Sequence, residues 1–420
     1  MDQSTYNPPK NQDIMQEGLN EIVELENKLR ASRIPESLKE ETMKSVQRLR
    51  MMFRFGGYSA EYETVSKYVD WIVRVPWGNV TEDSLDINRA RKDMDLTHYG
   101  MGTIKELILD YLATMKLQNM GKVPVPQSHT RMPSQIPSRT TVDLPSSSPL
   151  SPPPPPTTFQ QIPVQAKEEG GSKSVKGANT PVLLFLGLQG VGKTSIARSI
   201  ANSMGRKFSR ISLGGMGDVR LLRGTPKYSP NAEPGQIVKS LIRCGTMNPV
   251  ILLDEIEKGS RSTGLLSDIM AILLEILDPE QNSTFVDHYI DYPIDLSKVF
   301  FICTANNLGG LSTALLDRLE VIRFTSYSDQ EKEVIGREYI LPSVLNELNL
   351  TSDHIQIEEE VWPLIIRPVG FDAGIRQLER NIRTMVRSAA RMIVEGKPLP
   401  IVINSSNLSE YVLADQGPLS

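Results

Sequence analysis

Eight consecutive residues near the middle of the chain limit its possible folds more than any other stretch. They read Gly187-Leu188-Gln189-Gly190-Val191-Gly192-Lys193-Thr194 and fit the phosphate-loop pattern G-x-x-x-x-G-K-[ST]. Apolar residues 182–186 predict a buried strand before the loop, and residues 194–201 predict a helix after it. Glycines let backbone N–H groups close around an anion, and a helix start adds partial positive charge. The alternative, a chance glycine-rich turn, does not explain the strand and helix on either side.

The loop predicts a site for a nucleotide polyphosphate with its metal ion. In such a site the Lys193 ammonium reaches the β- and γ-phosphates, and the Thr194 hydroxyl holds Mg²⁺. We therefore expect ATP and Mg²⁺ as cofactors, bound by all eight residues of the loop.

Strands and helices alternate around this loop, over residues 180–327. The apolar runs 249–253 and 299–304 are typical of parallel strands covered on both faces, and a helix is expected at 265–277 between them. The fold class is therefore α/β with a parallel sheet. From residue 328 to residue 420 the periodicity is mainly helical, which predicts a small all-α domain with a short strand after Pro400.

The first 120 residues predict a helical segment, interrupted at Ile34-Pro35-Glu36. Its first two helices could form a packed hairpin or a long arm, and their thin apolar stripe favours the arm. Residues 121–179 are rich in Pro, Ser and Thr, with unbroken proline at 152–156. Such a composition buries too little apolar surface to fold, so we expect a flexible linker. The alternative is a proline-rich ligand for a partner.

Charge and hydropathy limit the class of partner. The net charge of -4 leaves no basic excess, which argues against a nucleic-acid-binding protein. No apolar run is long enough for a membrane span. The first residues contain neither a secretory apolar region nor an arginine-rich presequence.

Acidic and amide side chains follow the two apolar strands. Asp254 and Glu255 come at the end of 249–253, where Asp254 is expected to hold Mg²⁺ and Glu255 to orient or deprotonate the attacking water. Asn306 follows 299–304 and is expected to place that water. Each signal is weak alone, because strand ends are often acidic and Asn is a common turn residue. After a complete phosphate loop they predict a hydrolytic site.

Two arginines complete the predicted site. Arg318 could project into the phosphate site of a neighbouring subunit, and Arg376, at the start of a helix, could reach back to the same phosphates. Either arginine alone is more often part of a surface salt bridge.

These motifs together resemble the ATPase module of the Lon family of ATP-dependent proteases, within the AAA+ class. Residues 20–117 also resemble the helical segment that precedes the ATPase in that family. The matching stretches are 187–194, 210–215, 252–258, 277–282, 315–322 and 374–380, with Tyr68-Val69-Asp70-Trp71, Val75-Pro76-Trp77 and His98-Tyr99-Gly100 in the helical segment. The resemblance implies an AAA+ domain, an all-α lid and an N-terminal helical arm.

The resemblance also implies how such a module works. It predicts a homo-oligomeric ring, commonly a hexamer, in which each ATP site lies between subunits and Arg318 is supplied in trans. The ring is expected to act on unfolded or misfolded protein substrates. By position, Tyr228 is the residue that grips substrate in the pore, although Ser229 and Pro230 after it depart from the family pattern. Tyr99 lies in a segment that resembles an adenine contact.

The family's peptidase domain has no counterpart in this sequence, so the resemblance predicts an ATPase that does not itself cut peptide bonds. The proline-rich insertion and residues 210–215 are similar to peroxisomal Lon of the fungal type, which implies the peroxisomal matrix, or otherwise the cytoplasm. One alternative is a catalytically weak or truncated relative that binds nucleotide and regulates full-length rings. Another, an AAA+ clamp loader or helicase, is disfavoured because no basic patch is present.

Overall fold

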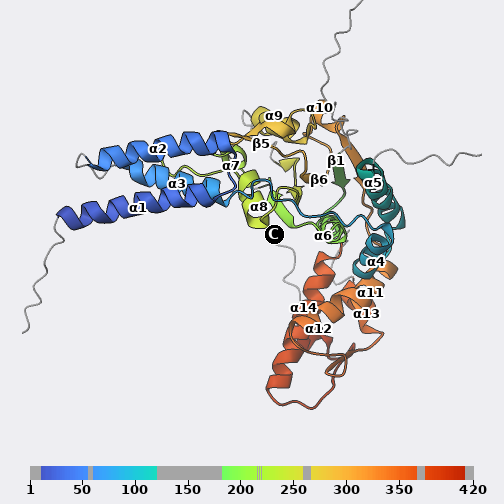
Figure 1. The fold of residues 1–420 in the computed structure, drawn as a ribbon. Helices are drawn as coiled ribbons and strands as arrows, with labels where there is room; N and C mark the ends of the chain where they lie inside the picture. The colour runs from blue at the N-terminus through green and yellow to red at the C-terminus, as the bar shows by residue number, and fades with distance from the viewer. Residues whose placement is uncertain are drawn as a thin grey trace, which may run out of the picture. The chain divides into compact units, whose positions relative to one another are not determined.

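The computed structural model describes residues 11–54, 60–120, 182–258, 266–366 and 374–411, except residues 215, 217 and 219 (Figure 1). The described residues up to 116 and from 182 onward belong to one compact unit. The predicted proline-rich linker, residues 121–179, lies outside the described residues.

A five-stranded parallel sheet is the centre of the α/β region, with strand order β2-β3-β6-β1-β7. The predicted parallel sheet is confirmed. Its strands are β1 (Val182–Leu186), β2 (Phe208–Ser212), β3 (Val250–Asp254), β6 (Phe300–Ala305) and β7 (Leu319–Arg323). Connecting helices are α6 (Lys193–Ser203), α7 (Arg220–Arg223), α8 (Gln236–Cys244), α9 (Leu266–Leu277) and α10 (Thr313–Leu316). A small antiparallel pair, β4 (Phe285–Val286) and β5 (Pro293–Ile294), lies beside them.

Alternation along the strands places side chains in two separate cores, one on each face of the sheet. In β1, Leu184 and Leu186 belong to the core shared with α8 and α9, whereas Leu183 and Phe185 belong to the core shared with α6. Both faces are therefore covered, which explains why these strands read as continuous apolar runs.

The N-terminal helices pack together, as Figure 1 shows for α1, α2 and α3. Their bounds are α1 (Asn11–Ala31), α2 (Glu36–Arg54), α3 (Ala60–Arg74), α4 (Ile87–Thr97) and α5 (Gly102–Met120). The expected long arm is wrong for α1 and α2, which form a packed pair. The apolar stripe is thin, but Ile22, Leu25 and Leu29 are all at most 3% exposed. These side chains join the core that also contains residues of α8 and α9.

The C-terminal region, which we call the lid, is mainly helical and has its own core around Trp362. Its helices are α11 (Asp329–Ile335), the π-helical turn Gly336–Ile340, α12 (Leu341–Glu347), α13 (Val361–Ile366), α14 (Arg376–Val394) and α15 (Leu408–Tyr411). It also contains a two-stranded parallel sheet, β8 (Ile355–Ile357) with β9 (Ile401–Ile403). The all-α prediction does not include this sheet, except for the short strand expected after Pro400.

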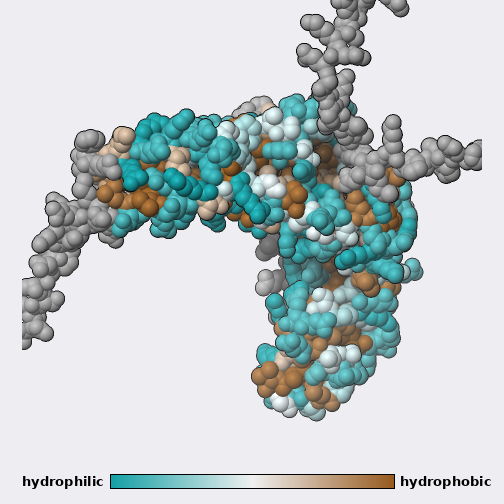
Figure 2. Space-filling view, viewed as in Figure 1, coloured by the Kyte–Doolittle hydropathy of each residue, from teal (hydrophilic) through white to brown (hydrophobic). Residues whose placement is uncertain are grey.

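The visible surface is largely hydrophilic, with hydrophobic areas that include part of the lid (Figure 2). Exposed apolar side chains of the lid are Leu348, Leu364, Val394, Leu399 and Val402. Among the described helices, none combines the length and apolar character that crossing a bilayer requires.

Candidate nucleotide-binding site

The predicted site residues meet at one edge of the sheet. β3, β6 and β1 are neighbours in the strand order, and their carboxyl ends carry Asp254, Asn306 and the phosphate loop in turn. Ligands of open parallel sheets bind outside the carboxyl ends of the strands. The sheet topology therefore brings together three motifs that are spread over more than 100 residues of the sequence.

The phosphate loop turns sharply between β1 and α6. Gly190 and Gly192 have φ of +81° and +92°, a region that side chains with a Cβ rarely adopt. Lys193 lies inside the loop, where its Nζ donates hydrogen bonds to the carbonyl oxygens of Gly187 and Leu188 and to Oδ1 of Asn306, 3.1 Å away. Burial lowers the pKa of Lys193 from its ordinary value, and the nearby carboxylates oppose that shift. In this structure the lysine ammonium is therefore held by oxygen atoms of the loop and of Asn306.

Asp254 is 6% exposed at the end of β3. Its Oδ2 accepts a hydrogen bond from Nε of Arg210 at 2.8 Å, and its Oδ1 accepts one from the Thr304 hydroxyl. The Thr194 hydroxyl makes no hydrogen bond to any other residue that the structure describes. A free hydroxyl and a carboxylate are hard oxygen donors of the kind that Mg²⁺ takes beside phosphate oxygens, so these two residues fit the ion.

Glu255 follows in an unusual backbone conformation, with φ of +59°. Such a conformation in a residue other than glycine costs free energy and recurs at functional sites. Its N–H donates to the Thr304 hydroxyl at 3.0 Å, and its Oε1 accepts from Nζ of Lys258 at 2.8 Å. The carboxylate is therefore held by Lys258 through Oε1.

Asn306 links the lysine of the phosphate loop to a third acidic residue, Glu257. While Oδ1 of Asn306 accepts from Lys193, its Nδ2 donates to Oε1 of Glu257 at 2.8 Å. The sequence interpretation did not single out Glu257. The residue lies in the matching stretch 252–258, but that stretch predicts nothing about its partner.

Arg376 reaches the phosphate loop from the lid. Its Nη1 donates to Oε1 of Gln189 at 3.2 Å, and the N–H of Ile375 donates to the carbonyl of Gly190 at 3.1 Å. Gly374 lies so close to the loop that an added Cβ would meet the carbonyl oxygen of Gln189 at 2.5 Å. The start of α14 is therefore packed directly on the predicted phosphate site.

Arg318 is bound by Ala314 and Asp278 rather than by residues of the phosphate loop in this chain. Its Nη1 donates to the carbonyl of Ala314 at 2.9 Å, and its Nη2 donates to Oδ2 of Asp278 at 3.1 Å. The N–H of Glu280 and, after it, the Arg318 guanidinium hold the pKa of Asp278 below its ordinary value. Among the described residues, Arg318 makes no hydrogen bond or ion pair with the phosphate loop of its own chain, so its action in trans stays a prediction.

In the segment predicted to contact adenine, His98 rather than Tyr99 makes a hydrogen bond to the helix that follows the phosphate loop. Tyr99 packs against Tyr339 of the lid, with 6.5 Å between ring centroids, and its adenine contact stays a prediction. By contrast, Nε2 of the buried His98 lies 2.9 Å from the Ser195 hydroxyl. The Tyr327 hydroxyl, which the sequence interpretation also missed, donates to the carbonyl of Val191 at 3.2 Å.

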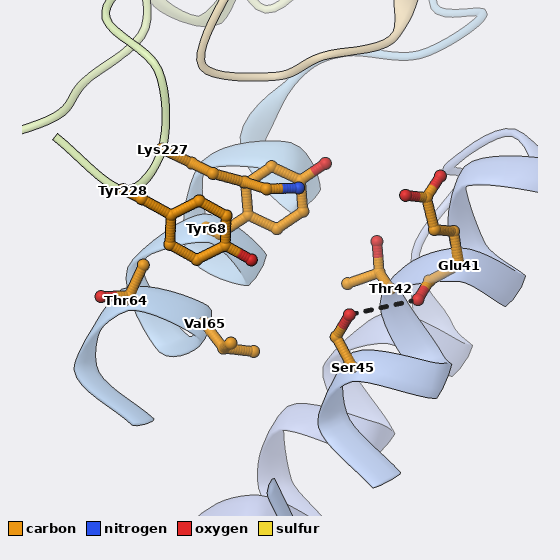
Figure 3. Close-up of a pocket in the computed structure, with 8 residues that line it drawn as sticks. All are labelled: Glu41, Thr42, Ser45, Thr64, Val65, Tyr68, Lys227 and Tyr228. Atoms are coloured by element: carbon orange, nitrogen blue, oxygen red, sulfur yellow. Dashed lines mark hydrogen bonds between the residues drawn. The ribbon is translucent and has the colours of Figure 1, made fainter. Parts of the chain in front are cut away.

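Tyr228 projects from a loop that we call the Tyr228 loop, residues 224–235, and is 74% exposed. The loop lies beside α2 and α3, where Lys227 extends between the rings of Tyr68 and Tyr228 (Figure 3). A pocket there is lined by Glu41, Thr42, Ser45, Thr64, Val65, Tyr68, Lys227 and Tyr228. The aromatic side chain is thus available to a partner molecule, while Lys227 connects its loop to α3.

Comparison with known proteins agrees with this geometry. Residues 183–327 match the model of the ATPase family associated with various cellular activities (AAA), and residues 346–401 match the Lon protease AAA+ ATPase lid domain. The chain is 37% identical over 397 residues to Lon protease 2 of Thermus thermophilus, covering 94% of this chain and 43% of that protein.

Other Lon proteases give similar figures. The Lon protease of Elusimicrobium minutum is 38% identical over 394 residues, and Lon protease 1 of Bacillus subtilis is 35% identical over 392 residues. Each of these alignments covers 93% of this chain, and they cover 40% and 43% of the relatives. The chain therefore spans about two fifths of the length of the relatives it matches. It carries an AAA ATPase domain followed by a Lon-type lid, and it is homologous to bacterial Lon proteases over their ATPase region.

Proposed function

We propose that this chain hydrolyses ATP to move unfolded or misfolded protein, as the ATPase part of a Lon-type ATP-dependent protease. One observation carries the proposal: Lys193 of the phosphate loop is joined to Asn306 at the ends of neighbouring strands. Asp254 and Glu255 end the next strand in the same sheet. A phosphate-binding lysine, a water-placing amide and a candidate base are thus together.

The reaction follows from these side chains. The phosphate loop binds the triphosphate, and Lys193 and Arg376 offset negative charge that shifts toward the leaving phosphate oxygens. Glu255 accepts a proton from water as the water oxygen bonds to the γ-phosphorus. The bond from that phosphorus to the β,γ-bridging oxygen then breaks, which yields ADP and inorganic phosphate. Mg²⁺, held by Thr194 and Asp254, would neutralise phosphate charge when bound.

Contacts between the lid and the phosphate loop offer a route from hydrolysis to movement. Because Ile375 and Arg376 contact the phosphate loop directly, loss of the γ-phosphate would change the position of α14. The exposed Tyr228 would grip the polypeptide, since an aromatic ring offers a large apolar contact without sequence specificity.

The ring is part of the same proposal. Arg318 would act on the ATP of a neighbouring copy in a homo-oligomer, commonly a hexamer, because its own chain holds it at Asp278. Exposed apolar residues of the lid would be covered by another subunit or by further parts of a longer protein. We keep the peroxisomal matrix as the proposed location, on the likeness of residues 210–215 and the proline-rich insertion to the fungal peroxisomal type.

ATP turnover by the purified chain tests the proposal. We expect phosphate release that rises when an unfolded protein is added, and that is lost in Glu255→Gln, which keeps the shape of the side chain but cannot accept the proton. Glu320→Gln, an exposed change on β7, is the matched control and should behave as wild type. Nucleotide binding without turnover would overturn the proposed hydrolysis and favour a nucleotide-binding regulator.

A further inference from the structure

Glu257 is a buried carboxylate next to the candidate site, and none of the predicted motifs gives it a role. The residue is 3% exposed. Its Oε1 accepts from Nδ2 of Asn306, whereas its Oε2 has no hydrogen-bond partner within the described parts of the chain. Burying a carboxylate costs free energy unless its oxygens are hydrogen bonded. A half-satisfied carboxylate in this position therefore requires an explanation beyond stability.

The chemistry of the two side chains fixes the orientation of the Asn306 amide. An amide has a donor end and an acceptor end, while an ionised carboxylate only accepts hydrogen bonds. Glu257 therefore selects the donor end, Nδ2, for itself. The acceptor end, Oδ1, is left on the opposite side, where it lies 3.1 Å from Nζ of Lys193.

This orientation matters because of what happens to Lys193 when ATP binds. Its ammonium has three protons, and in the structure they meet the carbonyl oxygens of Gly187 and Leu188 and Oδ1 of Asn306. Phosphate oxygens compete for the same protons. Once Lys193 turns to the phosphates, Oδ1 of Asn306 becomes an open acceptor at the edge of the site, suited to a water O–H.

We propose that Glu257 is a positioning residue that keeps the acceptor oxygen of Asn306 directed at the hydrolysis site, both before and after Lys193 moves to the phosphates. The inference rests on the proposed ATP hydrolysis and deepens it. Glu257 itself touches neither nucleotide nor water in this scheme, and it acts through the orientation of one amide.

Glu257→Gln is the sharpest test, because it keeps the size and shape of the side chain. Glutamine can offer either a donor or an acceptor to Asn306, so the amide is no longer held one way round. We expect kcat for ATP to fall about tenfold, the value of one lost hydrogen bond, with the KM for ATP changed less than about threefold. The melting temperature should stay the same or rise, because a buried charge is removed. Unchanged kcat in this variant would overturn the inference.

A double-mutant cycle separates positioning from a general structural effect. If Glu257 acts through Asn306, Glu257→Gln should cause no further loss of kcat in an Asn306→Ala background. Two effects that multiply in full would contradict the inference. Glu320→Gln, which removes an exposed carboxylate from β7, is again the control for loss of charge.

If the chain binds ATP but does not hydrolyse it, the proposed function is wrong and kcat can no longer test the role of Glu257. The Asn306 amide then provides the test. Side-chain NMR of Asn306 should show one slowly exchanging amide in the wild type, and a faster-exchanging amide in Glu257→Gln. Identical amide exchange in the two proteins would overturn the inference about Glu257, whether or not the chain hydrolyses ATP.

Discussion

Asp287 accepts a hydrogen bond from the N–H of Gly235, with 2.7 Å between Oδ2 and N, and this bond closes the base of the Tyr228 loop. The same carboxylate accepts from the N–H groups of Tyr289 and Ile290 through Oδ1, at 2.8 and 3.1 Å. The other end of the loop is equally close, because an added Cβ at Gly224 would lie 2.6 Å from Oδ1. One buried side chain thus fixes both ends of the loop that presents Tyr228.

Asp287 predicts an unusual dependence of stability on pH. Burial raises the pKa of Asp287 from 3.8 to about 6, although its hydrogen bonds act in the opposite direction. Between these pH values the folded chain binds more protons than the unfolded chain, so stability falls as pH rises through that window. The loss attributable to Asp287 is about 3 kcal/mol.

Denaturant unfolding from pH 4 to pH 7 measures this effect when wild type is compared with Asp287→Asn. The difference in unfolding free energy, wild type minus variant, should decrease across the window, because the amide does not titrate. A difference that does not change with pH would show that folding does not raise the pKa of Asp287.

His98 predicts a dependence of the opposite sign. Burial, aided by the charge of Lys105, lowers the pKa of His98 from 6.5 to about 4. The unfolded chain therefore takes up a proton first as pH falls, and the folded state loses roughly 3 kcal/mol between these pH values. Nε2 of His98 lies 2.9 Å from the Ser195 hydroxyl and Nδ1 lies 2.8 Å from the Thr97 hydroxyl, so each ring nitrogen of the neutral imidazole has a hydroxyl partner.

His98→Gln removes this titration. The variant should lose less stability than wild type when unfolding is compared at pH 7 and pH 4.5, and Asp287→Asn serves as the control of opposite sign. Equal loss in wild type and His98→Gln would mean that His98 becomes protonated in the folded chain without penalty.

Hydrophobic periodicity and motif spacing were sufficient to predict the sheet and the residues at its edge. The strands of Asp254 and Asn306 are buried on both faces, so their apolar runs are continuous, and parallel strands bring their ends together. The packing of α1 on α2 was not predictable from their own stripe, because part of the surface that covers Ile22 and Leu29 comes from other elements.

The features of the site that the sequence did not predict depend on contacts between segments far apart in the chain. Glu257 and Asn306 are 49 residues apart, and only the fold shows that one carboxylate meets one amide. Likewise, the sequence placed Tyr99 in a nucleotide-contacting segment, but the direction of its ring depends on Tyr339 of the lid.

Arg376 should contribute to turnover more than to folding. Its guanidinium is held at the phosphate loop by Gln189, so Arg376→Ala removes a positive charge from the predicted phosphate site. We expect kcat/KM for ATP to fall about 100-fold, as when one preorganised donor is removed from a catalytic site. Arg380→Ala, on the exposed face of the same helix, is the matched control. Equal turnover in the two variants would exclude Arg376 from the site.

Mixed subunits test whether Arg318 acts on a neighbouring copy. Arg318→Ala lacks the arginine and Lys193→Ala lacks the phosphate-binding lysine, so each protein alone should be inactive. Each variant still keeps the residue that the other lacks. In a mixture, an intact phosphate loop of one copy can meet an intact arginine of the other, and activity should return in part. No recovery in mixtures that are shown to co-assemble would place Arg318 outside a shared site. Arg323→Ala, on β7, is the control and should retain turnover alone.

The Tyr228 ring should determine how well unfolded protein stimulates the ATPase. The side chain is exposed, and Lys227 lies 5.2 Å from the ring centroid of Tyr68 and 5.6 Å from that of Tyr228. Tyr228→Ala removes the aromatic contact and should raise the concentration of polypeptide needed for half-maximal stimulation several-fold, by the loss of about 1 kcal/mol of aromatic contact. Tyr228→Phe keeps the ring and should stay near wild type. If Tyr228→Ala responds to polypeptide as wild type does, the gripping residue must lie elsewhere in the chain.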